Sequence, residues 1–352
     1  MGSVGFPGVG CVVEAVEVTC GGGPVGIVIY SALKELINKN IINLKEIKSI
    51  YSTSIGAFIS FILLLNIEWK WIDDFIIKRP WEELINFSSL DYFNLFFTKG
   101  LCDKEFYINC LKSLFLTADI DINITLKEFY DLNKIEWHIF TSNLNKFTKV
   151  DLSYKTHPDL SVIDAITMSS SIPIIIKPPY YNNEYYLDGG LFCNNPANEC
   201  LFTEKCLENE IFCFINDKRN PIDLSNNYYK NIENEIINDE ISNNILNENT
   251  NIFAFLIFII KTIFKKIMVI ENENTYNFKN SINVALTEST VDINYWYFVF
   301  SNKEEREYLM RLGICQANNY ISKNIYNNAN SYSIKFNDIS FNLNDCSFEN
   351  II

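Results

Sequence analysis

The sequence predicts an α/β protein, in which a mostly parallel central sheet is flanked by helices. Three observations support this class. The chain has 352 residues, enough to bury a large core. Strand-like and helix-like segments alternate in its first part. Clusters of glycine or small polar residues separate these segments where a strand passes into a helix. After residue 216 the composition changes, and we expect residues 206–352 to form a helical, asparagine-rich C-terminal extension.

Two strand–turn–helix units open the predicted fold. A valine-rich run at 11–20 has strand character, and a helical pattern follows its glycine turn at 27–38. An apolar run at 47–51 has strand character too, and the apolar helix expected at 57–65 follows it almost at once. This βαβα order is typical of a parallel sheet, and it opens both turns on the same edge of that sheet.

The middle of the chain predicts further helices and strands. Residues 69–116 have a helical pattern, and we interpret Trp69, Trp71 and Trp81 within it as packing residues because of the area they bury. The other elements expected before residue 190 are helices at 125–132 and 162–169 and strands at 135–142, 147–152 and 185–187.

The C-terminal extension divides into four predicted segments. Residues 216–251 form an Asn-rich insertion, and 252–270 are apolar but interrupted by three lysines. The lysines favour a buried helix at 252–270 over a membrane span, with an interfacial helix as the alternative. A strand is expected at 291–300, and an amphipathic helix at 303–321 closes the fold.

Composition and charge exclude several functions. The net charge is −14 and the pI is about 4.7, which argues against a nucleic-acid partner and against electrostatic adsorption to anionic lipid. Any membrane contact has to be hydrophobic. The ten cysteines lack a C-x-x-C pair and the spacing of a zinc module, so we expect free thiols in a reducing compartment. No secretory signal is recognisable, and we expect a cytoplasmic protein without a metal or cofactor.

The first candidate site is the glycine turn formed by Gly21, Gly22, Gly23, Pro24, Val25 and Gly26. Its backbone N–H groups can face a phosphate or an oxyanion without obstruction by a Cβ atom. A plain tight turn is one alternative. A dinucleotide fingerprint is another, with Glu46 twenty residues beyond, but Glu46 precedes the second strand whereas a ribose-binding acid follows it.

The second candidate site is Ser54, at the corner between the second strand and its helix. The segment Ser52-Thr53-Ser54-Ile55-Gly56 approximates the G-x-S-x-G nucleophile elbow, with serine in place of the first glycine. An elbow exposes its serine at the sheet edge, beside the N-terminal amides of the next helix. The alternative is a strand-to-helix connection rich in N-capping hydroxyl groups.

A nucleophilic serine requires a base, and the chain offers only two histidines. His138 lies in an apolar strand, where a core role is expected, and His157 precedes a proline in a loop without a motif. A carboxylate base is therefore favoured. Asp188 is the best placed on sequence because it follows a strand and precedes Gly189 and Gly190. An ordinary Asp-Gly turn is the alternative.

Together, these motifs resemble the patatin-like phospholipases. The family patterns G-G-G-x-[RK]-G, G-x-S-x-G and D-G-[GA] match residues 21–26, 52–56 and 188–190 in order, and residues 158–196 resemble the family's approach to its aspartate. The resemblance implies an α/β hydrolase with a Ser54–Asp188 dyad. It also implies an oxyanion hole at Gly21, Gly22, Gly23, Gly26 and Ile55, supported by Ser52, Gly56, Gly189 and Gly190.

The resemblance further implies a phospholipase A-type enzyme, such as a phospholipase A2, that acts on acyl lipids as a peripheral protein at a membrane or lipid-droplet surface. A patatin-like catalytic domain is expected at 11–205, and 206–352 would complete the fold. Two positions depart from the pattern: Val25 stands at the Arg/Lys position, and Ser52 at the first elbow glycine. They leave open a weakly active or inactive lipid-binding descendant, and the nucleotide-binding alternative also remains.

Overall fold

A computed structural model describes residues 15–18, 22–84, 97–216, 278–286 and 293–331, with residues 255, 258, 259 and 262. Gly21 of the predicted oxyanion hole lies outside the described residues. So do all but the first residue of the insertion at 216–251 and all but four residues of the helix expected at 252–270.

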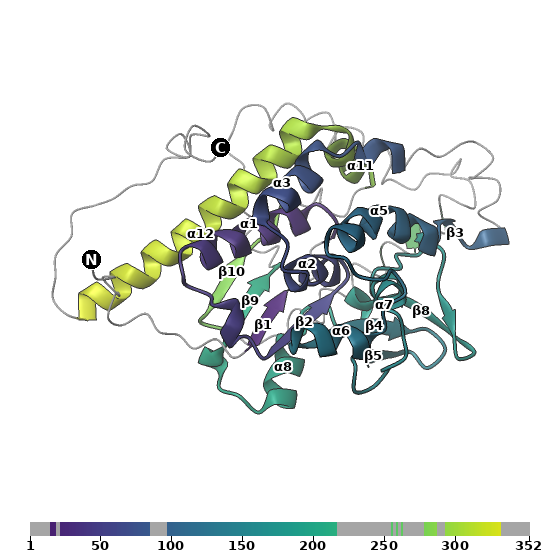
Figure 1. Cartoon of the computed structure of the whole chain (residues 1–352), viewed down its shortest axis with the longest axis horizontal. Coiled ribbons are helices and arrows are strands. Elements are labelled where there is room, and N and C mark those ends of the chain that lie inside the picture. Colours follow the sequence, from purple (N-terminus) through teal and green to yellow (C-terminus); the bar gives the residue numbers. More distant parts are fainter. Residues whose placement is uncertain are drawn as a thin grey trace.

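The centre of the molecule is an eight-stranded sheet with the order β10-β9-β1-β2-β4-β8-β7, and β5 pairs with β4 as well (Figure 1). Pairing is parallel from β10 to β4 and antiparallel where β4 meets β5 and β8 and where β8 meets β7. This confirms the mostly parallel sheet. The strands are β1 (Ala15–Val18), β2 (Ser49–Thr53), β4 (Glu136–Asn143), β5 (Thr148–Leu152), β7 (Tyr180–Tyr181), β8 (Glu184–Asp188), β9 (Ile211–Ile215) and β10 (Ser281–Asn283), and a second small sheet pairs β3 (Gly100–Cys102) with β6 (Ile174–Ile176).

Helices cover both faces of the sheet. On β2, Ile50 packs into the large core, whereas its neighbour Tyr51 packs on the other face against α8 (Ala197–Glu204). The other helices are α1 (Val25–Asn38), α2 (Ile55–Leu64), α3 (Trp69–Lys78), α5 (Lys104–Thr117), α6 (Leu126–Asn133), α7 (Val162–Ser169), α11 (Ile293–Ser301) and α12 (Lys303–Ser331). In Figure 1 the long helix α12 lies alongside α1. No helix in the described part of the chain combines the length and apolarity needed to cross a bilayer.

Two sequence-based predictions were wrong. The segment expected as a strand at 291–300 is helix α11. Its aromatic and β-branched residues favour a strand, but Tyr295 and Val299, four residues apart, bury the same helical face, so packing decides the conformation. Trp71 is not a packing residue, because its side chain is 62% exposed on α3, whereas Trp81 is buried and donates its indole N–H to the Ile76 carbonyl oxygen at 3.0 Å.

The close packing of α1 against α12 depends on Gly313. A Cβ atom at this position would lie 2.0 Å from Ser31 Oγ and 2.2 Å from the Val28 carbonyl oxygen. Glycine is unfavourable inside a helix by about 1 kcal/mol relative to alanine. Its presence here therefore reflects the contact between the two helices.

We expect Gly313→Ala to lower the free energy of unfolding by about 1–3 kcal/mol, because overpacking outweighs the gain in helix propensity. Urea denaturation followed by circular dichroism measures the change. Ser322→Ala, at an exposed position of the same helix, is the control and should not lower stability. A Gly313→Ala variant as stable as the wild type would contradict the assigned contact.

Candidate active site

Ser54 has a strained backbone at the corner between β2 and α2. Its φ of 54° and ψ of −123° lie outside the regions that residues with a Cβ atom favour. The Ser54 N–H donates to Ser169 Oγ at 2.8 Å, and Ser169 Oγ donates to the Phe140 carbonyl oxygen at 2.6 Å. Ser169, the last residue of α7, thus fixes the corner to β4. In the sequence, Ser169 is the first of three consecutive serines inside the family-like run 158–196, and its own pattern does not indicate this contact.

The pairing of β4 brings Ser54 and Asp188 together. β2 pairs with residues 136–140 of β4 and β8 pairs with residues 141–143, while β5 pairs with 139–143. Because β5 overlaps both of the other strands, it occupies one edge of β4, and β2 and β8 must share the opposite edge. The two strands therefore end against each other, with Thr53 opposite Phe140 and Asp188 opposite Thr141.

At this junction the Ser54 hydroxyl donates to Asp188 Oδ2 at 2.5 Å. Both side chains are buried, with 6% and 7% of their surface exposed. The second carboxylate oxygen, Oδ1, accepts the Gly190 N–H at 2.7 Å, and the Asp188 N–H donates to the Ser171 carbonyl oxygen at 2.9 Å. The carboxylate is thus oriented on both sides, with one oxygen directed at the serine.

Burial raises the pKa of Asp188 from its usual value of 3.8 to about 6. The hydrogen bonds from Ser54 and Gly190 oppose this shift because they stabilise the charged form. A carboxylate with a raised pKa is a stronger base than a solvated aspartate, while it remains mostly ionised at neutral pH. Asp188 is therefore suited to accept a proton from Ser54.

Glycine is required where the backbone passes close to the dyad. At Gly189 a Cβ atom would lie 2.2 Å from the Phe140 carbonyl oxygen, and at Gly26 it would lie 2.4 Å from Ile55 Cγ1. Gly22 and Gly23 have positive φ angles of 71° and 54°. The close contacts at Gly26 and Gly189 and the positive φ angles of Gly22 and Gly23 explain why glycine occupies these positions.

The glycine turn lies beside the elbow. β1 pairs with β2 in parallel, with Val18 opposite Ser52, so the turn that follows β1 opens on the edge that carries Ser54. The amides of Gly22 and Gly23 donate no hydrogen bond to an acceptor among the described residues. They are suited to hold an oxyanion, with the Ile55 amide at the start of α2 as a further donor. Val25 is fully buried at the start of α1, so an apolar contact replaces the cation of the family pattern.

Ser52, the departure from the elbow pattern, fits its site. Its buried hydroxyl accepts the indole N–H of Trp137 at 2.8 Å and donates to the His138 carbonyl oxygen at 3.4 Å. Trp137 is also buried, so Ser52 supplies the acceptor that its indole requires. The structure therefore shows Ser52 and Trp137 as a matched pair beneath the elbow.

The two histidines have other partners. His138 Nδ1 lies 2.7 Å from Asp151 Oδ2 and its Nε2 lies 3.1 Å from Glu136 Oε1, with the ring stacked on Tyr51. This confirms the expected core role of His138. His157 Nδ1 lies 2.9 Å from Thr156 Oγ1. In the described part of the chain, Ser54 Oγ thus contacts the Asp188 carboxylate and not an imidazole ring.

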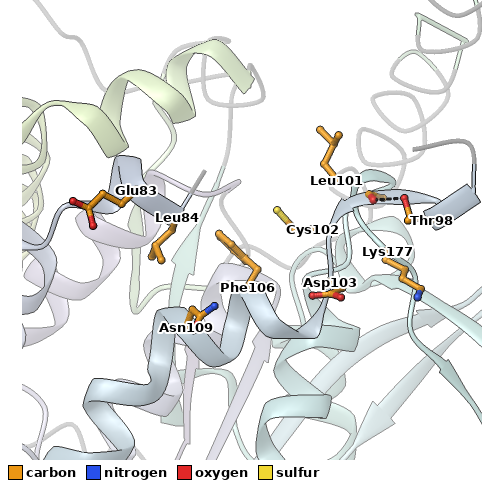
Figure 2. A pocket seen from close by; sticks show the side chains of 10 residues that line it. Glu83, Leu84, Thr98, Leu101, Cys102, Asp103, Phe106, Asn109 and Lys177 are labelled. Carbon is orange, nitrogen blue, oxygen red and sulfur yellow. Dashed lines mark hydrogen bonds between the residues drawn. The ribbon is translucent and has the colours of Figure 1, made fainter. Parts of the chain in front are cut away.

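A cavity of about 360 Å³ lies between helix α5 and strand β3 (Figure 2). Phe106 projects into it between Leu84 and Cys102, and neither member of the dyad lines it. The next residue of α5, Tyr107, donates its hydroxyl to the Ser170 carbonyl oxygen at 2.8 Å. Helix α5 thus connects the cavity wall with the loop that holds Asp188.

Comparison with known proteins agrees with this geometry. The family model for patatin-like phospholipase matches residues 18–201. The chain belongs to the patatin-like phospholipase family. The match spans the glycine turn, the elbow and the Asp188 loop, so every motif of the family resemblance lies inside it.

Two viral proteins each match about half of the chain. "Probable lipid hydrolase 463L" of Invertebrate iridescent virus 6 is 29% identical over 183 residues, which cover 51% of this chain and 61% of that protein. "Uncharacterized protein R571" of Acanthamoeba polyphaga mimivirus is 28% identical over 177 residues, which cover 50% of this chain and 58% of that protein. The chain thus spans about three fifths of the length of these relatives. Among solved structures, VipD from Legionella pneumophila superposes with a TM-score of 0.49 at 15% identity, over 89% of this chain and 67% of that chain.

We expect Ser52→Gly, which restores the patatin-like elbow pattern, to destabilise this protein by about 1–3 kcal/mol, because it leaves the buried Trp137 N–H without an acceptor. Adding Trp137→Phe removes that donor. The double variant should therefore lose less stability than the two single variants summed, as urea denaturation of all four proteins would show. Strict additivity would contradict the pairing.

Proposed function

We propose that this protein is a lipid acyl hydrolase of phospholipase A type, with Ser54 as nucleophile and Asp188 as general base. The observation that carries the proposal is the 2.5 Å hydrogen bond between Ser54 Oγ and Asp188 Oδ2 at a strained, buried strand-to-helix corner. Backbone strain of this kind costs about 1–3 kcal/mol and concentrates at functional sites.

In the acylation step, Asp188 accepts the hydroxyl proton as Ser54 Oγ attacks the acyl carbonyl carbon. The developing oxyanion faces the amides of the glycine turn and of Ile55, and each well-placed donor lowers the barrier by about 3–4 kcal/mol. When the tetrahedral intermediate collapses, the ester C–O bond breaks. The leaving alcohol takes the proton from Asp188, and the acyl group remains on Ser54.

In the deacylation step, Asp188 accepts a proton from a water molecule as the water oxygen attacks the acyl carbonyl carbon. The second intermediate collapses with Ser54 Oγ as leaving group, and Oγ recovers the proton from Asp188. A fatty acid is released and the dyad returns to its starting state. The Gly190 amide holds the carboxylate in position through both steps.

Family membership and the relative named as a lipid hydrolase support an acyl lipid as substrate, most simply a phospholipid at a membrane or lipid-droplet surface. The net charge of −14 favours hydrophobic over electrostatic attachment and disfavours nucleic acid. The ten cysteines of the sequence lack the spacing of a disulfide framework or a zinc module, which fits a reducing compartment such as the cytoplasm.

A catalytically inactive lipid-binding protein is the alternative that the Val25 substitution favours. A nucleotide-binding function has less support, because Glu46 ends a short 3-10 helix before β2 and is not at the end of that strand. Labelling with a fluorophosphonate separates these functions, since only an activated serine reacts.

We expect Ser54→Ala and Asp188→Asn each to lower release of fatty acid from phospholipid vesicles by at least about 1000-fold, because dyad members act as a unit. Ser60→Ala is the matched control, since Ser60 is buried on α2 and its hydroxyl has no hydrogen-bond partner among the described residues. It should retain activity and fluorophosphonate labelling. Near-wild-type turnover by Asp188→Asn would show that another group is the base.

The rate should also depend on pH through Asp188. Only the ionised carboxylate accepts a proton, and its pKa is raised to about 6. The value of kcat/KM for an uncharged ester should therefore fall about tenfold per pH unit below pH 6 and level off above it. A pH–rate profile with its acid limb centred near the usual aspartate pKa of about 4 would contradict this assignment.

A further inference from the structure

Two hairpins extend past the catalytic edge of the sheet. The β4–β5 turn comprises residues 144–147, and the β7–β8 hairpin comprises residues 180–185; together they are called the hairpin platform below. Both lie beyond the point where Ser54 and Asp188 meet. Strand β4 continues past Phe140 to the first turn, and strand β8 leads from the second hairpin back to Asp188. The platform thus stands on the side from which a substrate reaches the dyad.

The two hairpins form one connected unit. The Leu144 N–H donates to the Tyr185 carbonyl oxygen at 2.8 Å, and the Tyr185 N–H donates to Asn145 Oδ1 at 2.7 Å. Lys146 Nζ lies 2.8 Å from Glu184 Oε1. The platform therefore presents a fixed surface.

That surface exposes large apolar side chains. Leu144 is 43% exposed, Phe147 61% and Tyr180 60%. Phe147 has a φ of 55°, an unfavourable conformation for an aromatic residue, and its ring packs edge-on against Phe192 at 4.6 Å between centroids. The protein thus maintains an exposed aromatic side chain at the cost of backbone strain.

The charges of the platform favour a neutral partner. The two charged residues of the platform, Lys146 and Glu184, pair with each other, so the platform itself has no net charge, while the whole chain carries −14. The cation beside it, Lys99, lies 5.8 Å over the Tyr185 ring, and one lysine gives only a weak attraction to anionic lipid. Exposed apolar and tyrosine side chains beside a paired lysine suit the interface of a zwitterionic bilayer, where rings bury their apolar body and keep their polar end in water.

The dimensions fit the same partner. Leu144 lies four residues beyond Phe140, which pairs with the residue before Ser54, so the platform stands about 13 Å out from the nucleophile. One leaflet of a bilayer core is about 15 Å thick. A lipid drawn partly out of the bilayer can therefore bring its ester to Ser54 while its chain ends remain at the surface.

We propose that the hairpin platform, through Leu144, Phe147 and Tyr180, docks the protein on a phosphatidylcholine bilayer and so presents the lipid ester to Ser54. The proposal rests on the proposed function for its substrate. Docking itself is measured by binding and does not require turnover.

The test compares three proteins in flotation with phosphatidylcholine vesicles. The first is Ser54→Ala, which binds without hydrolysis. The second adds Leu144→Ser and Phe147→Asn, because asparagine tolerates a positive φ and should preserve the turn. The control instead adds Leu116→Ser and Leu132→Ser, which replace leucines that are 70% and 64% exposed on α5 and α6. Leu132 lies just before β4 begins, at the edge away from Ser54.

We expect the platform variant to bind vesicles at least tenfold more weakly and the control to bind like Ser54→Ala. With Ser54 restored, the ratio of vesicle hydrolysis to hydrolysis of a soluble short-chain ester should fall at least tenfold in the platform variant alone. Equal binding by the platform variant, an equal loss in the control, or no vesicle binding by Ser54→Ala overturns the proposal. So does a dimer, detected by light scattering without lipid, that the platform substitutions dissociate, since a second copy would then occupy this surface.

A failed hydrolysis test has a separate meaning. If the wild type hydrolyses neither vesicles nor the soluble ester, the proposed function fails, while flotation still decides whether the platform binds lipid.

Discussion

One edge of β4 is shared by two strands, and the site depends on this arrangement. β2 ends on it after residue 140, and β8 begins to pair at residue 141, so the last residues of both strands meet. A serine that follows one strand and an aspartate that ends the other come into hydrogen-bond contact as a direct consequence. Displacing either strand by one residue would move its side chain to the other face of the sheet and separate the pair.

Two energetically unfavourable features lie at this junction. Ser54 is held in a strained conformation, and Asp188 is a buried carboxylate whose ionisation burial opposes. Neighbouring polar groups compensate both: Ser169 accepts the Ser54 amide, and Gly190 donates to the carboxylate. The raised pKa of Asp188 means that the folded state binds its proton more tightly than the unfolded chain does. This group therefore costs stability at neutral pH, and the cost falls progressively as the pH drops from about 6 towards the usual aspartate value of 3.8. In the proposed mechanism, this cost accompanies a base whose pKa lies near neutrality.

The dyad and the hairpin platform differ in burial and in polarity. The inner groups, Ser54 and Asp188, are buried and fixed by short hydrogen bonds. The hairpin platform instead exposes apolar side chains, and its lysine and its glutamate form an ion pair. Because the chain as a whole is strongly acidic, a neutral apolar surface above the dyad is the part of the molecule best able to approach a lipid interface.

The sequence alone predicted the parallel sheet and the two strand–turn–helix units, and it selected Ser54 and Asp188, which the structure brings into hydrogen-bond contact. These features have local requirements that a sequence records directly: glycine where φ is positive or a Cβ atom would clash, and small residues at a sharp corner. His138 could also be assigned to the core, because it lies within an apolar strand. The domain boundaries at 205 and the roles of the segments from 216 to 270 remain predictions.

Only the tertiary structure decided the features that depend on distant partners. Residues 291–300 are helical because Tyr295 and Val299 pack on one face, although their intrinsic preference favours a strand. Ser52 is tolerated because the Trp137 indole, 85 positions away in the chain, requires its oxygen. Ser169 accepts the Ser54 amide only because α7 ends against β4. The sequence by itself determined which groups are proposed to carry the chemistry, since those groups follow local backbone rules. The fold determined how they are oriented, buried and charged, because these properties arise from contacts between segments far apart in the chain.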